Sequence, residues 1–199
     1  MLNRFREKLV PITTLIGNNF GSLGLSPTYW SMIAFAFAIL SSIFFGISTF
    51  LSEQGIVFPS QIIASIMLLI SGFFDIVDGS VAQVSKRATS RGAFLDSNFD
   101  KISEALIFIG IAIGGLSSPI LAMIALSTSI LVSYLRARAE SLGIELKGVG
   151  IGERAERLLI LSICGFIPIS GSIQWGIIII IVLSSFSYIQ RFWFVLKRI

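Results

Sequence analysis

Apolar residues run along the chain in six stretches separated by short polar turns. The stretches lie at about 28–50, 57–82, 92–115, 118–139, 154–170 and 173–195. Each is close to the roughly 20 apolar residues that a helix needs to cross a bilayer. The pattern therefore predicts an all-α integral membrane protein in which residues 28–196 form a core of six transmembrane helices.

The segment before the first apolar stretch has a different pattern. Its apolar residues recur at helical spacing, with charged residues between them, at Leu2, Phe5, Leu9, Ile12 and Ile16. Such a pattern favours an amphipathic helix that lies in the membrane interface. We therefore expect an interfacial helix over residues 1–21, bent near Pro11 because proline removes a backbone hydrogen bond.

Composition limits the possible organisation. The 199 residues are 54% hydrophobic and only 13% charged, and their mean hydropathy is +0.90. A chain this apolar is solvated by lipid, so we expect one membrane domain over residues 1–199 and no separate soluble domain. The absence of histidine and the single cysteine, Cys164, exclude histidine catalysis, histidine-ligated zinc and an intramolecular disulfide.

The basic residues indicate how the helices are oriented. The turns near 51–56, 115–119 and 170–173 contain no lysine or arginine, and all fifteen basic residues fall at the other ends of the predicted helices. By the positive-inside rule the basic side is cytoplasmic, so we expect both termini on that side of the cell membrane. The net charge of +4 then reflects topology and anionic headgroups, and we expect no nucleic-acid partner.

Four aspartates interrupt the apolar pattern. Asp75 and Asp78 end the second predicted helix, and Asp96 and Asp100 begin the third. Charges this close to hydrocarbon are costly and by default functional. Spacings of i, i+3 and i, i+4 put each pair on one helix face, and the short turn between the helices brings the two faces together at the cytoplasmic end.

A cluster of four carboxylates needs cations between its members, because like charges repel. Ligation by oxygen alone favours Mg²⁺ or Mn²⁺. Such a site binds phosphates and stabilises an in-line displacement on a nucleotide diphosphate. The aspartates therefore predict a site for one or two divalent ions, and we expect two. A path for cation transport is the alternative use of the same residues.

The stretch from Asp75 to Asp100 reads DIVDGSVAQVSKRATSRGAFLDSNFD. It resembles the signature of the CDP-alcohol phosphotransferase family, D-x2-D-G-x2-A-R-x8-G-x3-D-x3-D, and matches seven of its eight fixed positions. The resemblance implies that the four aspartates bind the metal ions and the diphosphate, and that Asp100 is also the general base. It further implies contacts with the CDP group from Asp78 and from three small residues, Gly79, Ala82 and Gly92.

The chain departs from the family pattern at two places. Gln83 stands where the family has arginine, and a neutral amide hydrogen-bonds a phosphate or base without adding charge. We expect Gln83 to contact the nucleotide and Lys86, Arg87 or Arg91 to supply the charge, with Arg87 assigned to the CDP site. Thr28 replaces the asparagine of the family's S-P-N segment at the start of the first span.

Arginines near the ends of the last three predicted helices indicate the acceptor. If they face one cytoplasmic cavity, their guanidinium groups suit phosphate oxygens. They are Arg136, Arg138, Arg154, Arg157 and Arg191. The segments R-A-R-A-E and G-x-x-E-R-A-E-R-L, which carry four of them, resemble the family branch that makes phosphatidylinositol phosphate in actinobacteria and archaetidylinositol phosphate in archaea.

Together these patterns predict a metal-dependent transferase of phospholipid headgroup synthesis. It transfers the phosphatidyl or archaetidyl group from CDP-diacylglycerol or CDP-archaeol to the hydroxyl of inositol phosphate and releases CMP. Glycerol 3-phosphate is the alternative acceptor, because it also needs a basic pocket. The resemblance also implies a homodimer within membrane lipid.

Overall fold

The protein is helical throughout the part of the chain that the structure describes. The structure, a computed structural model, describes residues 2–52, 57–85, 89–146 and 149–199. In these ranges it forms α1 (Leu2–Gly21), α2 (Pro27–Gly46), α3 (Ser48–Ser52), α4 (Val57–Ser85), α5 (Ser90–Ile113), α6 (Pro119–Ser141), α7 (Arg154–Phe166) and α8 (Ser172–Leu196). The all-α prediction is therefore confirmed.

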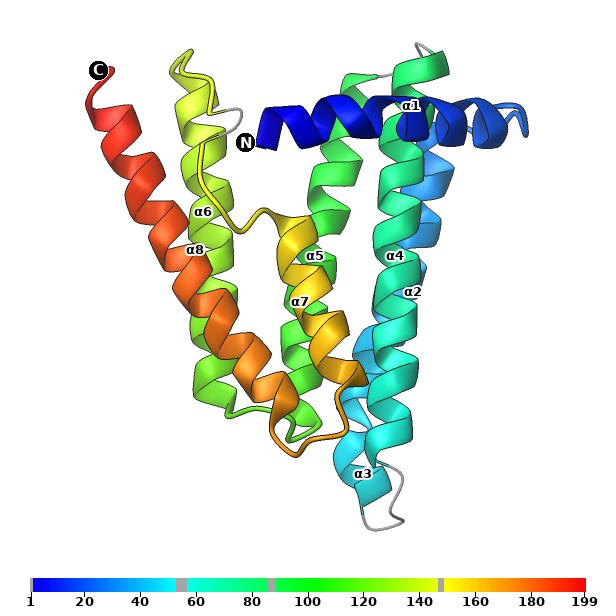
Figure 1. Ribbon diagram of the computed structural model, residues 1–199, viewed down its shortest axis with the longest axis vertical. Coiled ribbons are helices and arrows are strands. Elements are labelled where there is room, and N and C mark those ends of the chain that lie inside the picture. The colour runs from blue at the N-terminus through cyan, green and yellow to red at the C-terminus, as the bar shows by residue number, and fades with distance from the viewer. Residues whose placement is uncertain (1, 53–56, 86–88, 147–148) are drawn as a thin grey trace.

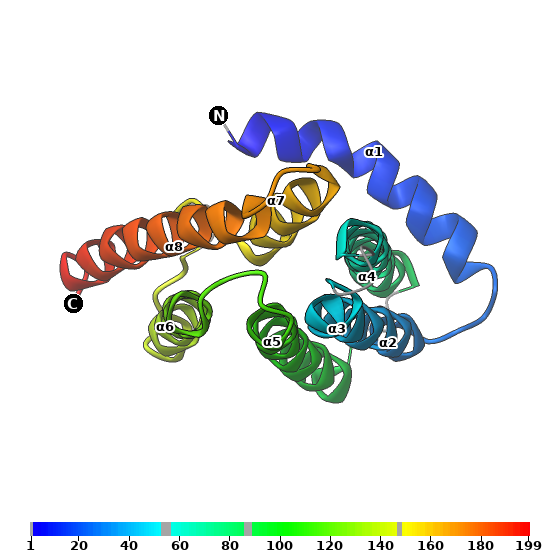
Figure 2. The same ribbon diagram turned by 90° about the horizontal axis from the view of Figure 1, so that it is seen from below.

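Six of the helices run along the long axis of the molecule. α2, α4, α5, α6, α7 and α8 lie along this axis, and α1 crosses them at the end where both termini lie (Figure 1). Seen along that axis, α4, α7 and α8 form one layer and α2, α5 and α6 form the other (Figure 2). The short helix α3 lies at the opposite end from α1. The molecule is thus a two-layer bundle with one transverse helix.

Within the described ranges, four helices are long and apolar enough to cross a membrane. These segments are Pro27–Gly46, Pro59–Ser85, Pro119–Ser141 and Ser172–Leu196. A multi-pass membrane protein is therefore confirmed. α5 has 24 residues but carries four charged residues in its first half. α7 has only 13 residues, so it measures about 20 Å, less than the roughly 30 Å of a bilayer's hydrocarbon core.

Two predicted helix boundaries were wrong. The first predicted span, 28–50, is divided, because α2 ends at Gly46 and the separate helix α3 follows. The fifth predicted span, 154–170, ends early at Phe166. Its last turn is broken because Pro168 disfavours the helical conformation at Ile167, whose φ and ψ are −85° and 118°.

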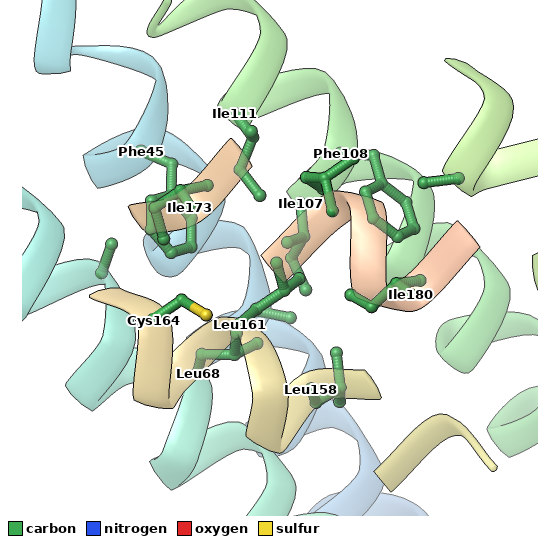
Figure 3. Packing of buried hydrophobic residues seen from close by; sticks show 14 residues of the cluster. Phe45, Leu68, Ile107, Phe108, Ile111, Leu158, Leu161, Cys164, Ile173 and Ile180 are labelled. Atoms are coloured by element: carbon green, nitrogen blue, oxygen red, sulfur yellow. The ribbon is translucent and has the colours of Figure 1, made fainter. Parts of the chain in front are cut away.

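The core lies where the two layers meet. Phe45 of α2, Leu68 of α4, Ile107 of α5, Leu161 of α7 and Ile177 of α8 are buried in one cluster, most of which is shown in Figure 3. Small residues allow the helix backbones to approach closely, as is usual in lipid. A Cβ atom on Gly110 of α5, for example, would overlap the backbone carbonyl of Ser42 on α2. This packing fixes α2, α4 and α5 against one another.

The transverse helix α1 packs on the end of α4. Ile16 and Phe20 of α1 contact the buried cluster of Trp30, Val77 and Val81. In the same half of α1, Ile12 and Leu15 are exposed. A helix over Leu2–Gly21 is therefore present, and it lies beside the segment of α4 that carries Asp78.

Candidate active site

The predicted aspartates converge where α4 ends and α5 begins. Asp75, Asp78 and Asp96 each place a carboxylate oxygen within 4.8 Å of the others. Asp100 joins them through Arg154, whose Nη1 lies 2.8 Å from Asp75 Oδ1 and 2.6 Å from Asp100 Oδ1. The spacing in the sequence predicted that the four carboxylates lie together, and the structure places them at one site.

The chemistry of this cluster fits a divalent cation. All the donors are carboxylate oxygens, which are the ligands preferred by Mg²⁺ and Mn²⁺. Arg154 supplies one positive charge in ion-pair contact with the described part of the cluster, against four carboxylates. A divalent ion would offset the remaining negative charge.

A hydroxyl group holds one of the carboxylates in place. Ser31 Oγ of α2 donates a hydrogen bond of 2.6 Å to Asp78 Oδ2, and both residues are buried. Sequence reasoning missed Ser31, because the contact joins residues 47 positions apart and no periodicity within α2 signals it. The hydrogen bond fixes the Asp78 carboxylate relative to α2.

One cavity at the cluster is small and adjoins Asp78 and Asp96. Its volume is about 180 Å³, and its lining comes from the start of α2, the end of α4 and the start of α5. The lining residues include Thr28, Ser31, Gly79, Ala82, Thr89 and Gly92. Four of the predicted CDP-binding residues, Asp78, Gly79, Ala82 and Gly92, are therefore gathered here.

Glycine leaves room in this cavity. A Cβ atom on Gly79 would meet no protein atom within 4 Å, so the space beside it is open. Gly92 donates its backbone N–H to Thr89 Oγ1 at 3.0 Å, which caps α5. Of the other predicted CDP-binding residues, Gln83 is exposed and does not line the cavity, and Arg87 lies outside the described residues.

The second cavity is larger and basic. It has a volume of about 640 Å³ and lies among α5, α6, α7 and α8. Asp75, Asp96 and Asp100 form part of its wall, so the aspartate cluster adjoins both cavities. Its basic lining residues are Lys101, Arg136, Arg154, Arg157 and Arg191. Sequence reasoning missed Lys101 as a cavity residue, because it counted this residue only among the basic residues of the predicted cytoplasmic side.

The predicted acceptor arginines differ in what they contact. Arg136 is exposed and pairs with Glu140 at 3.0 Å. Arg191 is buried and its Nε donates to the Val149 carbonyl at 2.8 Å. Arg138 is exposed and does not line the described cavity. Four of the five predicted arginines are therefore brought together.

Arg157 forms a buried ion pair. Its Nε and Nη2 lie 2.7 Å and 2.6 Å from Glu104 Oε1, and both side chains are only 2% exposed. Its Nη1 donates to the Gly152 carbonyl at 2.6 Å. Lys101 Nζ adds a contact of 3.8 Å with Glu104 Oε2. Glu104, which the sequence did not single out, thus ties α5 to the start of α7.

The loop before α7 places its arginines inside the bundle. After α6 the chain turns back toward the middle of the molecule before α7 begins (Figure 1). Gly150 and Gly152 have φ values of 96° and 83°, which favour glycine. Glu153 and Glu156 form a capping box around the first turn of α7. Because α7 begins inside the bundle rather than at its end, Arg154 lies beside the aspartates.

Comparison with other proteins gives consistent matches. The sequence pattern of the CDP-alcohol phosphatidyltransferase family matches residues 24–196. The archaetidylinositol phosphate synthase of Pyrococcus horikoshii is 33% identical over 199 residues, which cover 100% of this chain and 98% of that protein. The archaetidylinositol phosphate synthase of Methanothermobacter thermautotrophicus is 36% identical over 202 residues, with 100% and 96% covered.

Solved structures match along nearly the same length. The crystal structure of Mycobacterium tuberculosis phosphatidylinositol phosphate synthase with CDP-DAG bound has a TM-score of 0.74 and 25% sequence identity, and the match covers 93% of this chain and 94% of that chain. The structure of the same synthase with manganese and citrate has a TM-score of 0.73 at 25% identity, covering 92% and 88%.

Proposed function

The chain belongs to the CDP-alcohol phosphatidyltransferase family, and from this premise we propose that it transfers a phosphatidyl or archaetidyl group from a CDP-lipid to the hydroxyl of inositol phosphate. One observation carries the proposal: the aspartate cluster adjoins both a small cavity without basic lining residues and a larger basic one. The names of the relatives, archaetidylinositol phosphate synthase and phosphatidylinositol phosphate synthase, support inositol phosphate as the acceptor.

The small cavity is the proposed place of the cytidine end of the donor. Gly79, Ala82 and Gly92 have little or no side chain, so a planar base is able to approach the helix backbones there. Thr28 and Thr89 line the same cavity and offer hydroxyl groups for hydrogen bonds. The donor diphosphate would then lie at Asp78 and Asp96, of which Asp96 also lines the second cavity.

The aspartates are the proposed metal ligands. Asp75, Asp78 and Asp96 would hold Mg²⁺ or Mn²⁺, with Asp100 completing a site for two ions. When bound, the ions would supply positive charge to the diphosphate as CMP departs. The crystal structure of the mycobacterial synthase with manganese supports this assignment.

The acceptor is proposed to bind in the basic cavity. Arg136, Arg154 and Arg191 line it and are placed to hold a phosphate group, whereas Arg157 is already engaged by Glu104. The acceptor hydroxyl oxygen attacks the lipid-side phosphorus, and Asp100 takes the hydroxyl proton. The bond between this phosphorus and the bridging oxygen breaks, and CMP leaves with that oxygen.

We further propose a single membrane domain of six spans with α1 in the headgroup interface. α5 is about 36 Å long, enough to cross the hydrocarbon core, and none of its charged residues lies beyond Glu104. α7 is too short to cross the hydrocarbon core alone, so the loop before it would span the rest of that crossing. The distribution of basic residues supports a cytoplasmic site and cytoplasmic termini, and family resemblance supports a homodimer.

The test is CMP release by the purified protein in liposomes with Mg²⁺. CDP-archaeol or CDP-diacylglycerol is supplied with inositol phosphate, glycerol 3-phosphate, inositol or serine in separate reactions. Release with inositol phosphate alone is the expected result. Release with glycerol 3-phosphate alone would overturn the acceptor and keep the reaction. No release with any alcohol, together with cation flux in the same vesicles, would overturn the transferase.

A further inference from the structure

Arg154 contacts the aspartate cluster more closely than any other described cation. A single nitrogen, Nη1, bridges Asp75 Oδ1 of α4 and Asp100 Oδ1 of α5 at 2.8 Å and 2.6 Å. The side chain is 12% exposed. Its Nε atom is buried and has no hydrogen-bond partner among the described residues. Only one end of the guanidinium group is therefore committed to protein atoms.

The two oxygens that Arg154 contacts belong to proposed metal ligands. A carboxylate oxygen that accepts a charge-assisted hydrogen bond donates less well to a divalent ion. A fixed guanidinium beside the site also repels an incoming cation, and this repulsion is strong where water screens poorly. Arg154 and a divalent ion are therefore competitors for Asp75 and Asp100.

Arg154 also belongs to the basic cavity, and its neighbours there are held differently. Arg157 is fixed by Glu104 and the Gly152 carbonyl, and Arg191 by the Val149 carbonyl. Arg136 pairs with Glu140 at the exposed rim. Among the described basic residues of the cavity, Arg154 is the one in ion-pair contact with the aspartates. It is thus the residue able to exchange a carboxylate partner for an anion in the cavity.

We propose that Arg154 is an internal counter-cation of the aspartate cluster, which competes with divalent metal and gives up the carboxylates when a phosphate group enters the basic cavity. Without metal, its charge reduces the repulsion among the aspartates. With phosphate in the cavity, the guanidinium turns to the phosphate oxygens and the carboxylates are free to bind metal. The second step rests on the proposed function, whereas the competition does not.

Thermodynamic linkage makes the proposal quantitative. If phosphate removes a competitor of the metal, it raises the affinity for metal, and metal raises the affinity for phosphate by the same factor. Arg154 is the residue through which the two sites are coupled. Substituting it therefore has two effects, tighter metal binding in the absence of substrate and loss of coupling.

The test measures Mn²⁺ binding to the detergent-purified protein by electron paramagnetic resonance of the free ion, without substrate. Arg154→Gln is expected to bind Mn²⁺ about tenfold more tightly than the wild type, because a nearby positive charge is removed. Arg138→Gln, the same substitution at an exposed arginine outside the cavity, is expected to leave the affinity unchanged. Equal or weaker binding by Arg154→Gln would overturn the competition.

Folding is checked by thermal unfolding in EDTA and in Mn²⁺. Arg154→Gln is expected to unfold at a lower temperature than the wild type in EDTA and to gain more from Mn²⁺. If this variant does not fold, Arg154→Met is measured instead. Methionine also removes the charge and keeps a long, flexible side chain, so tighter Mn²⁺ binding than the wild type is expected, and unchanged binding would overturn the proposal.

A second set of titrations adds inositol phosphate or uncharged inositol. Inositol phosphate is expected to tighten Mn²⁺ binding several-fold in the wild type and not in Arg154→Gln, and inositol to change neither. If competition is observed but inositol phosphate has no effect on the wild type, the coupling to the acceptor is overturned. If CMP is released with inositol phosphate but Arg154→Gln does not bind Mn²⁺ more tightly, the competition is overturned and the proposed reaction stands.

Discussion

Two groups of charged side chains lie between the helices, and they differ in the ratio of cations to carboxylates. Glu104 has two cationic partners, Arg157 and Lys101. The aspartate cluster has four carboxylates and, in ion-pair contact among the described residues, Arg154. Both groups join α5 to α7, but Arg157 and Glu104 are only 2% exposed, whereas Asp75 and Asp100 are 32% and 25% exposed. A buried ion pair such as Arg157 and Glu104 ties helices together, whereas an excess of carboxylates within a membrane protein is a place for a cation.

The largest effect on activity is expected at Asp100, in the aspartate cluster. Asp100→Asn keeps the shape of the side chain but removes the proposed base, so CMP release should fall by about a thousandfold. The thermal stability of the variant should change little, because an amide can still accept a hydrogen bond from Arg154. The measurement is CMP release at saturating acceptor. Activity within tenfold of the wild type would remove Asp100 from the mechanism.

Breaking the ion pair of Glu104 and Arg157 should affect stability more than activity. Glu104→Gln leaves the buried Arg157 charge without its carboxylate, and the free energy of unfolding should fall by roughly 3–5 kcal/mol. Glu140→Gln removes the exposed partner of Arg136 and should cost at most about 0.5 kcal/mol. Reversible unfolding in mixed micelles measures both. A small loss for Glu104→Gln would contradict a structural role for the pair.

Ser31 offers a sharper test because it acts on the cluster through one hydrogen bond. Ser31→Ala frees the Asp78 carboxylate, and partners of this kind usually contribute about tenfold or more to metal affinity. Ser71→Ala is the matched control, because Ser71 Oγ also links α4 to α2, donating to the Ala34 carbonyl at 2.8 Å. Mn²⁺ titration should separate the two variants. Equal Mn²⁺ affinities of the two variants would mean that Ser31 contributes to packing and not to metal binding.

The smallest effect is expected at the rim of the basic cavity. Arg136→Gln should raise the KM for the acceptor about threefold, because an exposed charge contributes little. Arg138→Gln should leave KM unchanged, since Arg138 does not line the cavity. Steady-state kinetics with varied inositol phosphate compares them. A larger effect at Arg138 would show that the acceptor approaches from another side.

Local spacing was enough to predict the aspartate cluster. The i, i+3 and i, i+4 separations fix which helix face carries each pair, and only four residues separate α4 from α5 in the sequence. In the structure α4 and α5 each pack on α2. Helical geometry also explains why Arg138, predicted to bind the acceptor, does not line the basic cavity. Arg136 and Arg138 are two residues apart, so they lie on different faces of α6 and only one lines the cavity.

Other features depend on contacts between distant segments and leave no local pattern. The pairs Ser31–Asp78 and Glu104–Arg157 join residues 47 and 53 positions apart. Glu104 resembles any other charge within an amphipathic stretch until α7 is placed beside it. The early end of α7 was readable from Pro168, but its start inside the bundle depends on the glycines of the preceding loop.

The wall that the two cavities share affects the order of events in turnover. Ala93 and Asp96 line both cavities, and most other lining residues belong to only one of them. If the donor and acceptor occupy these cavities as proposed, each is able to bind without blocking the other. Group transfer would then proceed directly within a ternary complex, with no need for a lipid-modified enzyme. Initial rates measured at several fixed donor concentrations should give intersecting rather than parallel double-reciprocal lines.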